Sequence, residues 1–112
     1  RCLAAFSGRP EPEIKRAFKA LRWENAPDYD TWRTEVEQTR QSGYGVDDGN
    51  YIRGVTVAAA PVLGPGYTMA YGLALVGLSD QMRDSGHGVL GAQIKNVAAE
   101  LTEKLGGGGA SV

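Results

Sequence analysis

Two adjacent carboxylates, Asp47 and Asp48, and the single histidine, His87, are the side chains best suited to acid–base chemistry in this sequence. One of the aspartates acting with His87 would suit a small hydrolase or isomerase, in which positioned groups take up and return protons. Adjacent residues on a strand or turn point apart, so the two carboxylates are not expected to share one proton. The simpler interpretation is a turn at 47–50, and the enzyme stays an alternative function.

A second motif that could do chemistry is residues 86–91, which spell G-x-G-x-x-G just before a helix. A dinucleotide site needs this pattern to join a strand directly to a helix, with an acidic residue on a second strand about 20 residues later. Here the preceding strand is expected to end near Gly77, and a glycine-rich tail follows the helix. The motif is therefore interpreted as flexibility at a helix start, and no cofactor is expected.

Metal and nucleophile sites are not predicted by the remaining side chains. One cysteine, Cys2, and one histidine cannot form a cysteine- or histidine-rich ligand set, and the acidic residues are scattered. No serine has a triad partner that spacing alone would place beside it. We expect neither a metal nor a catalytic residue.

Size and charge narrow the classes of function. A chain of 112 residues fits one domain, and its net charge of −1 lacks the positive excess with which proteins neutralise nucleic-acid phosphates. The longest mostly apolar stretch, 68–78, is far shorter than the roughly 18 residues of a membrane span. Without an internal disulfide or a signal-peptide pattern, the sequence favours a cytoplasmic protein that contacts neither DNA nor membrane by itself.

Helical periodicity predicts two helices in the first part of the chain. Residues 10–13 are typical of a helix start, because proline is tolerated in the first turn and acidic residues there favour the helix dipole. This helix is expected to break at 25–27. A second helix should run from about Asp30, capped by Asp28 or Asp30 itself, to Gly43, since glycine adopts the left-handed conformation without steric cost.

After Gly43 the residue pattern becomes typical of strands. We expect a short strand at 44–46, a longer one within 54–63, a tight connection at 64–66 and a partner strand at 68–78. Both long strands are rich in alanine and glycine, so a helix or a ligand can pack close to them.

The clearest helix follows, with apolar residues at spacings of three and four over 90–105. Residues 106–112 are interpreted as a flexible glycine-rich tail after a domain over 1–105. The order of elements predicts an α+β fold, a small antiparallel sheet with helices packed on it.

Several short motifs follow one another at fixed spacing between residues 40 and 77. They are Arg40-Gln41-Ser42-Gly43-Tyr44, Asp47-Asp48, Gly54-Val55, Ala59-Ala60-Pro61-Val62 and the strand end at Gly77. In this order they resemble the effector-binding domains of IclR-family transcriptional regulators. The resemblance continues into the segment 3–6 and the closing helix, so it covers nearly the whole chain.

This resemblance implies the C-terminal portion of a GAF-like sensor domain. The rest of the sensor and a winged helix-turn-helix would precede Arg1, and DNA would be bound only through that upstream domain. Family members form dimers or tetramers, and a small molecule shifts their affinity for the operator by binding two states unequally. The chain itself would then not be an enzyme.

The residues of the family's effector pocket match this sequence only in part. Its aspartate at the acidic turn matches Asp47, but Val57 stands where a cysteine is common, and Ala74 and Val76 stand where two polar residues are common. Because alanine and valine cannot hydrogen-bond a carboxylate, the resemblance implies an effector more apolar or aromatic than glyoxylate or pyruvate. A buried Asp47 would need a partner, either a backbone N–H or an effector hydroxyl. A stand-alone ligand-binding or dimerisation module remains a further alternative.

Overall fold

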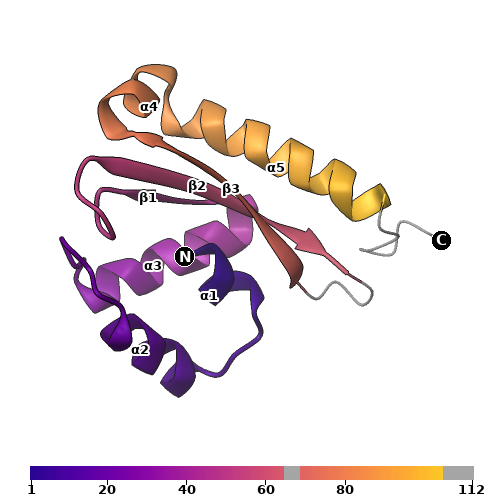
Figure 1. Ribbon diagram of the computed structural model, residues 1–112. Helices are drawn as coiled ribbons and strands as arrows, with labels where there is room; N and C mark the ends of the chain where they lie inside the picture. The colour runs from indigo at the N-terminus through magenta and orange to yellow at the C-terminus, as the bar shows by residue number, and fades with distance from the viewer. Residues whose placement is uncertain (65–68, 105–112) are drawn as a thin grey trace.

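The computed structural model describes residues 1–64 and 69–104, which form five helices and one three-stranded sheet. In chain order the elements are α1 (Cys2–Phe6), α2 (Glu11–Ala20), α3 (Tyr29–Ser42), β1 (Gly45–Asp48), β2 (Val55–Leu63), β3 (Met69–Leu78), α4 (Ser79–Ser85) and α5 (His87–Lys104). The sheet separates α4 and α5 on one side from α1, α2 and α3 on the other (Figure 1). The predicted α+β fold is confirmed.

The sheet is antiparallel throughout, with β2 in the centre and β1 and β3 at its edges. Along β2, buried and half-buried residues alternate, as expected for a strand with different surroundings on its two faces. The buried set, which includes Thr56, Ala58, Ala60 and Val62, faces α4 and α5. The intervening residues face α1 and the side of the molecule that carries α2 and α3.

The core beneath α5 is built from small side chains. Ala58 and Ala60 are fully buried against Ile94 and Ala98 of the helix, so the helix lies close to the sheet. Gly91 makes the closest approach, because an added Cβ there would lie 2.1 Å from Cε2 of Tyr44. The small residues on this face of the strands therefore allow α5 to pack close to the sheet.

The core on the other side is aromatic. The Phe18 ring has its centroid 4.8 Å from that of Trp32, 5.1 Å from that of Tyr29 and 5.2 Å from that of Trp23. Val36 of α3 is fully buried beside this group. These contacts join α2 to α3 and hold both helices beside α1.

The boundaries of α3 follow the sequence signals. The Asp28 side chain accepts a hydrogen bond from the Thr31 N–H at 3.2 Å, which caps α3, and Gly43 ends that helix with φ of +86°. The short helix suggested by the segment 3–6 is present as α1. None of the helices in the described ranges is long and apolar enough to span a membrane.

Four expectations about local structure were wrong. Helix α2 ends at Ala20, before the expected break at 25–27. The first strand continues to Asp48, so the turn begins at Gly49 and both aspartates belong to β1. Residues 79–85 form α4, which was not predicted, and α5 begins at His87 rather than Leu90. The predicted tail at 106–112 and most of the connection at 64–66 lie outside the described residues.

Candidate functional site

A row of cross-strand partners places the predicted site residues on one face of the sheet. Asp47 pairs with Val57, and Val57 pairs with Val76 on the far strand. Direct partners in an antiparallel sheet project their side chains to the same face. Ala74 lies two residues before Val76 and pairs with Ala59, so it occupies the next row on that face.

This face carries an open hollow of about 440 Å³, which the start of α1 borders. Three of the four predicted residues line it, namely Asp47, Val57 and Ala74. Val76 does not line the hollow, and its side chain is 62% exposed farther along the same face. The remaining lining is mostly apolar and comprises Arg1, Cys2, Leu3, Gly45, Val46, Ala59, Met69 and Gly72.

Asp47 has two firm partners at the edge of this hollow. Its Oδ1 accepts a hydrogen bond from Nη1 of Arg1 at 2.7 Å, and its Oδ2 accepts one from the backbone N–H of Tyr51 at 3.1 Å. The backbone N–H agrees with the expectation that a buried aspartate needs such a donor. The arginine was not anticipated.

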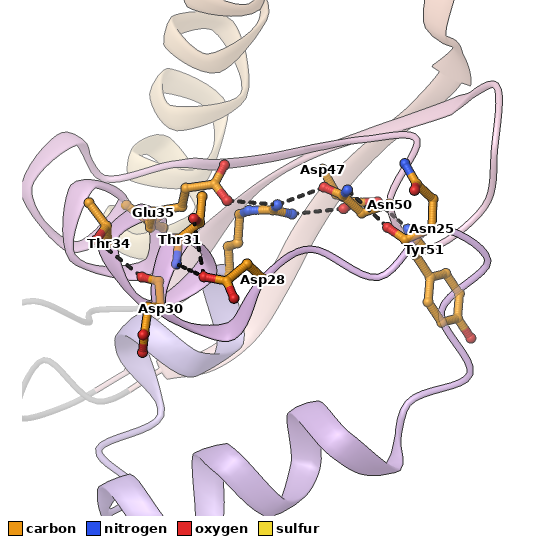
Figure 2. A network of polar contacts seen from close by, with 11 residues as sticks. Asn25, Asp28, Asp30, Thr31, Thr34, Glu35, Asp47, Asn50 and Tyr51 are labelled. Atoms are coloured by element: carbon orange, nitrogen blue, oxygen red, sulfur yellow. Dashed lines mark hydrogen bonds and ion pairs between the residues drawn. The ribbon is translucent and has the colours of Figure 1, made fainter.

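Arg1 joins three segments of the chain through one guanidinium. Figure 2 labels its three partners, Glu35, Asp47 and Asn50. Its Nη2 donates to Glu35 Oε1 at 3.1 Å and to Asn50 Oδ1 at 2.8 Å. The Arg1 side chain is only 5% exposed, whereas the carboxylates of Asp47 and Glu35 are 17% and 37% exposed. We call Arg1, Glu35, Asp47 and Asn50 the Arg1 cluster.

Asp48 points to the opposite face of the sheet. It accepts hydrogen bonds from Arg83 Nε at 2.9 Å and Nη2 at 2.8 Å, and from Thr56 Oγ1 at 3.2 Å. Nε2 of His87 is 3.2 Å from its Oδ2, near enough for an ion pair but not aligned as a hydrogen bond. The two aspartates are thus separated by the sheet, as their adjacency predicted, and His87 is the neighbour of Asp48 and not of Asp47.

The arrangement around Asp48 stabilises the fold more readily than it catalyses a reaction. The Arg83 guanidinium holds the pKa of the Asp48 carboxyl below its ordinary value, which disfavours its use as a proton acceptor near neutral pH. Within residues 1–64 and 69–104, no three His, Cys, Asp or Glu side chains gather closely enough to hold a metal ion.

Comparison with protein families gives a decisive match. The family model described as "Bacterial transcriptional regulator IclR C-terminal" matches residues 1–103, which is almost the entire chain. The chain belongs to the IclR family. No match was found among curated proteins.

Solved structures of IclR-type proteins share this fold. The repressor BlcR of Agrobacterium tumefaciens is 22% identical with a TM-score of 0.74, and the match covers 94% of this chain and 44% of that one. The IclR protein of Thermotoga maritima is 24% identical with a TM-score of 0.75, over 94% of this chain and 44% of that one. HmgR of Pseudomonas aeruginosa is 22% identical with a TM-score of 0.72, over 96% and 43%. The present chain therefore spans less than half the length of these three relatives.

Sequence reasoning did not predict that the start of α1 borders the hollow on the sheet. Arg1 and Cys2 border it although they are more than 40 positions from Asp47, and no local spacing connects them. The only available signal was a basic residue at the start of a short apolar helix. That these residues bind an effector stays a prediction.

The Asp48–Arg83 pair predicts a pH dependence of stability. Because Arg83 lowers the pKa of Asp48 in the folded protein, the unfolded chain binds a proton first as the pH falls. The pair therefore stabilises the fold above the unfolded pKa of about 4, and this contribution is lost as the pH falls through the lower folded value. We expect the loss of stability between pH 5 and 3, measured by urea unfolding, to be smaller in Asp48→Asn. An unchanged pH slope in that variant would contradict the assignment.

Proposed function

We propose that this chain is the effector-sensing and oligomerisation part of a bacterial IclR-type regulator. The observation that supports this proposal is the row of Asp47, Val57 and Val76 across three strands, with Ala74 in the next row. These residues lie beside an open hollow. One polar side chain among apolar ones suits a ligand that is mainly apolar and is oriented by one polar contact.

The charges at this site favour a neutral or weakly polar effector. The Arg1 cluster holds one guanidinium against two carboxylates, those of Asp47 and Glu35. A small carboxylate would have to compete with both acids for Arg1, and neither Val57 nor Ala74 can donate a hydrogen bond to it. An apolar or aromatic effector fits this lining better than glyoxylate or pyruvate.

The remaining parts of the function lie outside this chain. We propose that DNA is contacted through a separate winged helix-turn-helix domain and that the chain is not itself an enzyme. We also propose a cytoplasmic location and assembly into dimers or tetramers. Exposed apolar side chains on β3 support association, since Tyr71 is 65% exposed and Leu78 is 59% exposed.

The proposed contact face can be tested by adding a hydroxyl to it. We expect Val57→Ser or Ala74→Ser to raise the affinity for small carboxylates relative to aromatic ligands by roughly tenfold, the effect of one hydrogen bond to a charged group. Ligand titration calorimetry measures this ratio. Val89→Ser is the control, because Val89 lies on α5 and is 56% exposed.

Two results would count against the site. If Val57→Ser and Ala74→Ser leave every binding isotherm unchanged, the ligand does not contact this face. If no small molecule binds at all, the alternative of a dimerisation module, which the exposed residues of β3 favour, becomes the better account.

A further inference from the structure

A polar groove of about 490 Å³ lies between α3 and β1, the strand that forms one edge of the sheet (Figure 1). Its lining includes Val46 and Asp48 of β1, whose side chains point toward α5, and His87 at the start of that helix. It also includes side chains of α3, which lies on the other side of the sheet. The groove therefore extends around the free edge of β1, and we call it the β1 groove.

Two residues of β1 direct backbone groups into this groove. The Gly49 N–H donates to the Val55 carbonyl at 3.0 Å, and these two residues continue the pairing of Asp48 with Thr56. Bonded and non-bonded pairs alternate in an antiparallel sheet, so the N–H and C=O groups of Asp48 and Val46 point away from β2. Within residues 1–64 and 69–104, these groups have no hydrogen-bond partner.

The wall opposite β1 is polar. Its side chains recur at spacings of three and four and so form one stripe of α3, which comprises Glu35, Gln38, Thr39 and Ser42. The helix stripe that packs on a core is ordinarily apolar, and in α3 that stripe is formed by Trp32 and Val36 in the aromatic core. The β1 groove is therefore bordered by hydrogen-bonding groups on both sides, backbone groups on β1 and side chains on α3.

The charge that a ligand meets on the α3 side of the groove is negative. The Glu35 side chain is 37% exposed, and its Oε2 has no hydrogen bond or ion pair in the described part of the chain. Arg1 is the one arginine or lysine of the lining, but it is only 5% exposed and already donates to its cluster. A basic group near Glu35 therefore finds a carboxylate, whereas an acidic group finds no available guanidinium or ammonium.

We propose that the β1 groove binds an extended peptide that carries a basic side chain. The peptide adds to β1 as a fourth strand in one direction, bonds to the outward backbone groups of Val46 and Asp48, and places its basic side chain beside Glu35. Strand addition to a free sheet edge is a recurrent mode of peptide recognition, in which backbone bonds give affinity and side-chain contacts give specificity.

This site is distinct from the sheet hollow of the proposed function. The two sites share only Arg1 and Val46 among their lining residues. The hollow faces α1 and is mostly apolar, whereas the β1 groove follows the outer edge of the strand. The inference therefore does not rest on effector binding at Asp47, Val57 and Ala74.

The probe is an acetylated and amidated pentapeptide with the order threonine, valine, lysine, valine, threonine. The readout is the set of backbone amide signals in a ¹⁵N-correlated spectrum of the whole chain. We expect saturable movement of the Val46 and Asp48 signals, because their N–H groups gain acceptors. The Asp47 signal should move less, because its N–H group already faces β2.

Methylation of the peptide nitrogens tests strand pairing directly. Alternate N–H groups of a strand point to the same edge, so only one alternate set can bond to β1. Methylation of residues 2 and 4 of the peptide, or of residues 1 and 3, should abolish binding in one case and leave it nearly unchanged in the other. Both peptides carry the same number of methyl groups, so each is the control for the other.

Matched substitutions on α3 test the charge of the groove. Gln38→Lys should weaken binding of the lysine peptide roughly fivefold, the effect of one exposed like-charge contact. It should strengthen binding of the same peptide with glutamate in place of lysine. Gln41→Lys is the control, because Gln41 is exposed on the same helix and does not line the groove. Calorimetric titration gives these ratios.

Four results would overturn the proposal. They are no saturable response of Val46 and Asp48 at millimolar peptide, equal binding of the two methylated peptides, equal effects of the two glutamine substitutions, and binding lost in Ala74→Leu. The last would place the peptide in the sheet hollow and leave the proposed function standing. Conversely, failure of the serine substitutions at Val57 and Ala74 would leave the β1 groove untouched.

Discussion

Replacement of Arg1 by methionine is expected to lower the free energy of unfolding by about 3 kcal/mol, as when one partner of a buried ion pair is removed. The Arg1 side chain is 5% exposed and donates to Asp47, Glu35 and Asn50. Methionine keeps much of the buried volume but leaves two carboxylates without their cation. Urea unfolding at pH 7 measures the difference from the midpoint and the slope.

Arg83→Met is the matched control for this prediction. It removes the arginine that pairs with the neighbouring Asp48, but the Arg83 side chain is 53% exposed. Exposed ion pairs contribute little to stability, so this variant should be close to wild type in stability. Equal losses in the two variants would show that burial of the Arg1 cluster does not set its contribution.

Replacement of Gly91 by alanine is expected to destabilise the protein by about 2 kcal/mol, although alanine is the better helix former. The new Cβ would lie 2.1 Å from Cε2 and 2.3 Å from Cδ2 of Tyr44. The tyrosine ring would have to leave its place beside β2 and α5, which costs more than the roughly 1 kcal/mol that alanine contributes to a helix. Thermal and urea unfolding both report this change.

Gly88→Ala and a double variant make the argument specific. An added Cβ at Gly88 meets no atom within 4 Å, so this substitution should leave stability unchanged or raise it. In a Tyr44→Ala background, Gly91→Ala should become neutral or stabilising, because the clash is gone. A loss in Gly91→Ala that persists without the tyrosine would contradict the steric explanation.

The fold could be predicted where local signals and long-range packing agree. Asp28 and Gly43 mark the ends of α3 because capping and positive φ are properties of single residues. The hairpin of β2 and β3 follows from small and β-branched residues on both sides of a glycine-rich connection. Helix α4 was missed because residues 79–85 carry no apolar period, and only Ser79 and Met82 among them are buried.

The candidate site could be predicted in part for a similar reason. Asp47, Val57, Ala74 and Val76 share a face because strand pairing fixes which residues lie opposite, and the motif spacing reflects that pairing. The partnership of Arg1 with Asp47 spans 46 positions and depends on how α1 packs on the sheet. No spacing rule contains that information, so this contact appears only in the structure.

The placement of Asp47 and Asp48 on opposite faces of the sheet affects the register of β1 against β2. β1 has four residues, and a strand that short specifies its register weakly by apolar contacts alone. A slip by one position would turn each aspartate to the other face and would remove Asp48 from the Thr56 hydroxyl that lies opposite it. The hydrogen bonds of Asp48 therefore favour one alignment of the strand.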